Sequence, residues 1–177
     1  MLIWLHLYRY YICYVKNYFQ LFSQFLYSNL CKVCVLLLLD RFPEVAQLCD
    51  VCWLEIRGMI NTIVLSPNTQ YAAYAVFKMI DSRGFQNRPV ELSIGVEGGH
   101  SSTRNVCLDP NVEGMPHSRV VGLQRPSVRT DGWLEIEMGE FFNSGIENEE
   151  VHLNILEIKG GNWKSGLFLE GIEVRPK

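Results

Sequence analysis

The chain has 177 residues and a formal net charge of −3 at pH 7, which suits a single domain with an extension. So small a charge gives no basic surface of the kind that nucleic-acid-binding domains carry, and we expect no nucleic-acid partner. The sequence also lacks an acidic tail that would attract a polycationic partner.

The composition changes sharply near residue 40. Residues 1–40 include 29 apolar residues and six of the eight tyrosines, whereas residues 41–177 hold all fourteen glycines and all seven prolines. The first part has three basic and one acidic residue (net +2), and the second has 13 basic and 18 acidic residues (net −5). We therefore predict an apolar extension at 1–40 and a domain at 41–177, which is long enough to bury a core without disulfides or metals.

Three interpretations of residues 1–40 stay open. Residues 17–39 are long enough for a membrane-spanning helix and carry one charge, on Lys32, but polar side chains interrupt them. No small-residue cleavage site of a signal peptide follows the leucine run. The alternatives are non-coding sequence translated through a gene-model error and a genuine helical extension. We do not favour membrane contact through 17–39 and expect a cytoplasmic or nuclear protein.

Cysteine usage points to an intracellular protein. The domain holds three cysteines (Cys49, Cys52 and Cys107), an odd number that cannot pair completely, so reduced thiols are the simpler interpretation. Cys31 and Cys34 form a C-x2-C pair with a second such pair at Cys49 and Cys52, a spacing that formally resembles a zinc site. Cys52 lies in an alternating segment, where a thiol behaves as a small buried hydrophobe. We therefore predict no metal site and no cofactor.

The first half of the domain alternates between strand and turn signals. Residues 42–48 indicate a helical turn with Pro43 at an early position, and residues 51–58 alternate like a strand that ends at a glycine. A turn cluster at 66–69 follows. Residues 71–80 combine alanines with β-branched and aromatic residues, and the turns on both sides favour a strand buried on both faces.

The second half continues this pattern. Residues 97–130 are rich in glycine and proline and indicate a long loop region, and residues 140–143 indicate a short helical or turn segment. Further strands are predicted at 90–96, 104–108, 131–139, 151–159 and 167–175. Seven or eight short strands with turns between them are typical of a sandwich or jelly roll, and nothing indicates βαβ units.

Several sequence blocks carry a resemblance to a known family. They are CWLEIRG (52–58), LSPNT (65–69), YAAYAVFK (71–78), DGWLEI (131–136), GEFFN (139–143), LEIKGG (156–161), WKSGL (163–167) and GIEVRPK (171–177). In this order the blocks resemble the phloem protein 2 (Nictaba-like) lectin domain of plants and cover nearly all of residues 41–177. Each block alone is ordinary, but the ordered set is highly specific.

The resemblance implies an all-β fold, a jelly-roll-like antiparallel β-sandwich, here preceded by an apolar, helical extension. It also implies a lectin that binds N-acetylglucosamine-containing glycans, with a glycan or glycoprotein as the partner. The blocks are most similar to the subgroup in which an F-box precedes the domain. The alternative function is therefore a substrate receptor or adaptor fragment of an F-box ubiquitin-ligase protein, with weak or no sugar binding.

The first 40 residues depart from the family. They lack the Trp/Tyr-rich segment that precedes the first Trp-Leu strand in the tobacco-type lectin, and Trp4 is their only tryptophan. They also lack the Leu-Pro signature of an F-box. We therefore expect the fold to transfer from the family more directly than the sugar affinity does.

The candidate sugar-binding residues are Trp163, Asn162 and Lys164. Sugar sites combine an aromatic face with a few fixed polar groups, and Trp163 lies in a polar, glycine-rich segment between the other two. The alternative is that Trp163 packs on the edge of the sandwich. Trp53 and Trp133 are interpreted as structural.

We predict no catalytic residues. Strand carboxylates are candidates for acid–base chemistry, but each is flanked by apolar residues that point to the opposite face, so all are predicted on solvated outer faces. They are Glu55, Glu135, Glu137, Glu157 and Glu173. The histidines show no metal-ligand spacing, and no Ser–His or Cys–His motif is recognisable.

Overall fold

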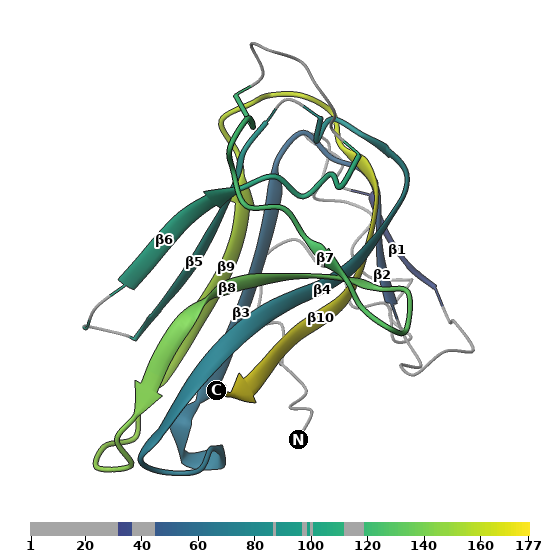
Figure 1. Cartoon of the computed structure of the whole chain (residues 1–177). Coiled ribbons are helices and arrows are strands. Elements are labelled where there is room, and N and C mark those ends of the chain that lie inside the picture. The colour runs from purple at the N-terminus through teal and green to yellow at the C-terminus, as the bar shows by residue number, and fades with distance from the viewer. Residues whose placement is uncertain (1–31, 37–44, 87, 97–98, 100, 112–118) are drawn as a thin grey trace, which may run out of the picture.

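Two antiparallel sheets make up a β-sandwich in the computed structural model, which describes residues 32–36, 45–86, 88–96, 99, 101–111 and 119–177 (Figure 1). The larger sheet has the order β1 (Lys32–Leu36), β2 (Val45–Asp50), β10 (Ser165–Pro176), β4 (Thr69–Arg83), β8 (Leu134–Asn143) and β7 (Ser127–Val128). The smaller sheet has the order β3 (Leu54–Asn61), β9 (Glu150–Glu157), β5 (Val90–Val96) and β6 (Ser101–Val106). The predicted jelly-roll-like antiparallel sandwich is confirmed for these residues.

Alternation of apolar side chains builds the smaller sheet. In β5 the side chains of Val90, Leu92 and Ile94 are buried, and the residues between them are less so. β3 and β9 show the same period of two, as expected when one face of a sheet packs on the core. These faces meet the inner face of the larger sheet in one continuous apolar cluster.

The central strand β4 is buried on both faces, as predicted. Its side chains Ala73, Ala75 and Phe77 belong to the main core, while Val76 packs with Trp133 in a second, smaller cluster. Because successive strand residues point to opposite faces, this second cluster covers the outer face of the larger sheet. Trp133 is only 1% exposed, so the prediction that it is structural is confirmed.

The chain crosses repeatedly between the two sheets. β3, β5, β6 and β9 lie in one sheet, and β4, β7, β8 and β10 lie in the other. The connections that pass from one sheet to the other gather at two opposite ends of the sandwich (Figure 1). We call residues 51–53, 84–86, 88–89 and 158–164 the loop end, and residues 62–68 and 144–149 the turn end.

One asparagine fastens the turn end. The Asn143 side chain is 2% exposed, and its amide nitrogen donates to the carbonyl oxygens of Thr62, Leu65 and Ser66 at 3.2, 3.3 and 3.0 Å. Its side-chain oxygen accepts from the Gly145 backbone N–H at 3.0 Å. A buried amide whose donors and acceptor all form hydrogen bonds holds the backbone around it in one conformation. Asn143 therefore ties together the two connections of the turn end.

Two local predictions were wrong. Residues 45–48, predicted within a helical turn, belong to strand β2 because they pair with both β1 and β10. Residues 140–143, predicted as a helical or turn segment, are the second half of β8 and pair with β4. The rings of Tyr71 and Phe141 stack across these two strands with centroids 5.6 Å apart.

The predicted N-terminal extension lies mostly outside the described residues. Of residues 17–39, the structure describes 32–36, which form strand β1 and pair with β2. Strand β1 thus belongs to the larger sheet although it precedes the predicted boundary at residue 40. Within the described ranges, no helix has the length and apolar character needed to cross a bilayer.

Candidate binding site at the loop end

The three residues predicted to bind sugar occupy different environments. Trp163 is 56% exposed, and Asn162 beside it is exposed as well. Lys164 is 0% exposed and forms an ion pair with the buried Glu157. The structure therefore presents Trp163 and Asn162 to solvent but not the ammonium group of Lys164.

The buried Lys164 holds two chain segments together. Its Nζ donates to the carbonyl oxygens of Cys52 at 2.8 Å and of Asn162 at 2.9 Å. Its backbone also exchanges hydrogen bonds with Val51, at 2.9 and 2.7 Å. Trp53 directly follows Cys52 in the chain, and Trp163 directly follows Asn162. The peptide groups that lead into both tryptophans are therefore fixed by one ammonium group.

Trp53 is a further candidate site residue, which sequence reasoning missed. It was interpreted as structural, but it lies in the bend before β3 and is 53% exposed. Alternation along a strand would place the Trp53 side chain on the same face of the sheet as that of Glu55. Because Trp53 lies in the bend before the strand, this rule does not determine its exposure. Two half-exposed indoles at the loop end provide apolar ring faces of the kind that stack on sugars.

Glu157 was predicted on a solvated outer face, and this is wrong. In β9 the buried residues are Val151, Leu153, Ile155 and Glu157, so Glu157 continues the core-facing series at the end of the strand. A buried carboxylate needs a partner because desolvating an isolated charge is costly. Lys164 supplies it, which explains why both charged residues are tolerated inside the sandwich.

A glycine lets the loops of this end pass close to one another. Gly84 has a φ of +82°, and a Cβ atom there would lie 2.2 Å from the carbonyl oxygen of Trp163. Both the left-handed backbone and the lack of space favour glycine at this position. The end of β4 therefore lies directly against the backbone of Trp163.

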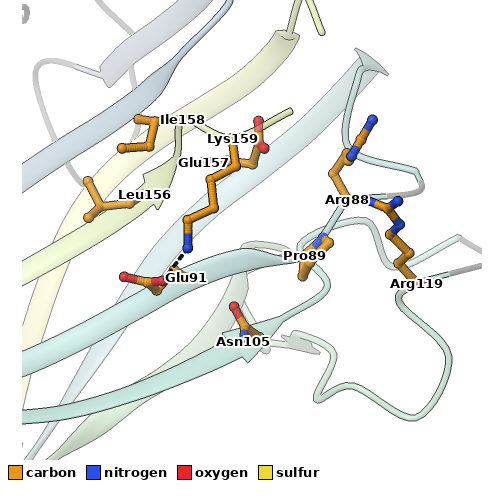
Figure 2. A pocket seen from close by; sticks show the side chains of 9 residues that line it. All are labelled: Arg88, Pro89, Glu91, Asn105, Arg119, Leu156, Glu157, Ile158 and Lys159. Carbon is orange, nitrogen blue, oxygen red and sulfur yellow. Dashed lines mark ion pairs between the residues drawn. The ribbon is translucent and has the colours of Figure 1, made fainter. Parts of the chain in front are cut away.

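A pocket of about 260 Å³ opens at the outer face of the smaller sheet, next to the loop end (Figure 2). It is lined by Arg88, Pro89, Glu91, Asn105, Arg119, Leu156, Glu157, Ile158 and Lys159. Figure 2 shows Lys159 reaching to Glu91, with Nζ and Oε2 3.6 Å apart. The volume is below the roughly 300–1,000 Å³ of pockets for drug-sized ligands, so it suits a ligand unit smaller than those.

The strand carboxylates considered for acid–base chemistry are each held in an ion pair with a basic side chain. The pairs are Glu55–Arg57, Glu135–Arg175, Glu137–Arg104, Glu157–Lys164 and Glu173–Arg129. Each of these carboxylates therefore has a basic group beside it that balances its charge.

The cysteines of the described residues do not form a metal site. No group of three or more His, Cys, Asp or Glu side chains in the described part could hold a metal ion. The side chains of Cys31 and Cys34, part of the zinc alternative, lie outside the described residues. Burial raises the pKa of the Cys107 thiol, which makes it a poor nucleophile at neutral pH.

Comparisons with known proteins agree with this architecture. The family model described as phloem protein 2 matches residues 32–176. F-box protein PP2-B10 of Arabidopsis thaliana is 48% identical over 140 residues, which cover 77% of this chain and 50% of that protein. Putative F-box protein PP2-B8 of the same plant is 44% identical over 144 residues, covering 77% and 47%. The chain thus spans about half the length of these curated relatives.

Among solved structures, the mosquito-larvicidal Cry4Aa toxin of Bacillus thuringiensis aligns with 76% of this chain and 19% of its own. The TM-score is 0.36 and the sequence identity 14%, and no conclusion is drawn from so weak a likeness. The family match, by contrast, extends from strand β1 to the end of β10. Because it covers both sheets of the sandwich, this chain belongs to the phloem protein 2 family.

Proposed function

We propose that the domain is a carbohydrate-binding module for N-acetylglucosamine-containing glycans, a binding protein rather than an enzyme. Trp163 and Trp53 supply the aromatic surface, and the exposed Asn162 supplies hydrogen bonds to hydroxyl or acetamido groups. One observation carries this proposal: two half-exposed tryptophans lie at the loop end, and the carbonyl group before each of them accepts a hydrogen bond from the ammonium group of Lys164. Because the backbone before each indole is already held in place, less conformational entropy is lost on binding, which favours affinity.

For Lys164 we propose a different role from the one predicted. Its ammonium group is buried and occupied by Glu157 and two backbone carbonyls, so it positions the site without touching the glycan. We place the protein in the cytoplasm or nucleus, because the three cysteines of residues 41–177 cannot all pair with one another.

Calorimetric titration with N,N′,N″-triacetylchitotriose tests the proposal. Trp163→Ala is expected to weaken binding at least about tenfold, since binding hot spots are enriched in tryptophan and cost about 2 kcal/mol or more when truncated. The matched control is Ile146→Ala, which removes an apolar side chain that is 85% exposed at the turn end. Its affinity should equal that of the unmodified chain. Unchanged binding in the Trp163 variant, or no binding by the unmodified chain, contradicts the proposal.

A second candidate function is favoured by the relatives. They are named F-box proteins, and the chain spans about half of their length. The domain could thus serve as the substrate-receptor part of an F-box ubiquitin-ligase protein, with the ligase scaffold as a partner. Sequencing of the full-length transcript tests this candidate, which requires an F-box encoded upstream of residue 32.

A further inference from the structure

The pocket beside the loop end contains several basic side chains, although the domain as a whole has a negative net charge. Residues 41–177 have 13 basic and 18 acidic residues, yet the pocket brings together Arg88, Arg119 and Lys159. Glu91 is engaged by Lys159, and the carboxylate of Glu157 is engaged by the buried Lys164. The acidic side chains of the pocket are therefore occupied, and the two arginines are not balanced by them.

Arg88 and Arg119 come from distant parts of the chain and both line one side of the pocket (Figure 2). Neither forms an ion pair with any residue in the described part of the chain. An anion in a pocket that two guanidinium groups line is attracted by both of them. Planar guanidinium groups bind carboxylate, sulfate and phosphate oxygens through paired hydrogen bonds. The arrangement thus fits an anionic group that enters from outside.

The pocket and the exposed tryptophan are joined by the same two loops. The connection from β9 to β10 begins at the pocket with Ile158 and Lys159 and reaches Trp163 four residues later. The connection from β4 to β5 begins at Gly84, against the Trp163 backbone, and ends at the pocket with Arg88 and Pro89. Four residues span at most about 14 Å, a distance that a short oligosaccharide can cover.

We propose that this pocket is a subsite for an acidic sugar residue, one that carries a carboxylate on its pyranose ring. The guanidinium groups of Arg88 and Arg119 bind the carboxylate, and the Asn105 side chain is placed to bond a hydroxyl group. Leu156, Ile158 and Pro89 give the pocket an apolar part that matches the C–H face of the ring. A peptide would not require the neighbouring indoles, which is why an acidic glycan is the preferred ligand.

This inference rests on the proposed carbohydrate binding, and its test separates the two. The probes are a galacturonic acid trisaccharide, its methyl ester and triacetylchitotriose, titrated into the full chain at one fixed salt concentration. The ester keeps the shape of the acid and removes its charge. The acid is expected to bind at least about tenfold more tightly than the ester, as for hydrogen bonds to a charged group.

The variant Arg88→Gln/Arg119→Gln should lose this preference and bind the acid as weakly as the ester. The matched control Arg83→Gln removes an exposed arginine that does not line the pocket, and it should keep the preference. If chitotriose binds but acid and ester bind equally, the acidic subsite is wrong while carbohydrate binding stands. If no saccharide binds, both fail. A phosphoserine peptide that displaces the acid with equal affinity would overturn the assignment to a sugar.

Discussion

Replacement of Lys164 by methionine is expected to lower the free energy of unfolding by about 3–5 kcal/mol, the usual cost of removing one partner of a buried ion pair. The side chain of Lys164 is fully buried, and that of Glu157 is 4% exposed. Methionine fills similar space but leaves the carboxylate in the core without a counter-charge. Urea denaturation followed by circular dichroism measures the loss.

A double variant and a control variant test whether the stability loss comes from the unpaired charge of Glu157. Adding Glu157→Leu to Lys164→Met removes the orphaned charge, so part of the stability should return. A deficit of about 1–3 kcal/mol should remain, because the carbonyls of Cys52 and Asn162 still lack their donor. Lys159→Met breaks an exposed pair with Glu91 in the same connection and should cost no more than about 1 kcal/mol. If Lys164→Met were as stable as this control, the buried ion pair between Lys164 and Glu157 would not be important for stability.

Replacement of Trp133 by alanine is expected to cost about 3–5 kcal/mol, the range for removing a buried tryptophan. The indole is 1% exposed and packs with Val45, Val76 and Phe168. The ammonium group of Lys78 also lies 4.3 Å from the ring centroid. The cavity left by the indole cannot close, because strands β4 and β10 on which it lies are paired along their length.

Thermal and urea denaturation of matched tryptophan variants measure this cost. Trp163→Ala removes the same side chain from a position that is 56% exposed and should change the stability by about 0.5 kcal/mol. The two variants thus separate a tryptophan that supports the fold from one that serves binding. Equal losses in the two variants would show that Trp163 is also part of the packed structure.

Much of the strand pattern could be predicted because burial on one face leaves a period of two in the sequence. β5 and β9 are clear examples. The prediction failed for residues 140–143 because Gly139 was interpreted as the end of a strand. In the structure it lies at a register shift, where Ala73 pairs with Gly139 and Tyr74 with Glu137. Glycine inside a strand often marks such a bulge, and β8 continues beyond it.

The candidate site was less predictable because it depends on contacts between distant segments. Trp163 was found from its polar, glycine-rich neighbours, which are local. The burial of Lys164 depends on Glu157 and on a carbonyl 112 residues away in sequence, so no local pattern reveals it. Likewise, Arg88 and Arg119 lie in different connections, and only the strand order brings them to one pocket.

The most direct test of the account is the NMR signal of each tryptophan indole N–H during titration with triacetylchitotriose. We expect the signals of Trp53 and Trp163 to shift together and saturate, while that of the buried Trp133 stays in place. Single Trp→Phe variants assign the signals. Binding that leaves Trp53 and Trp163 unshifted, or no shift of any indole at millimolar sugar, would contradict a carbohydrate site at the loop end.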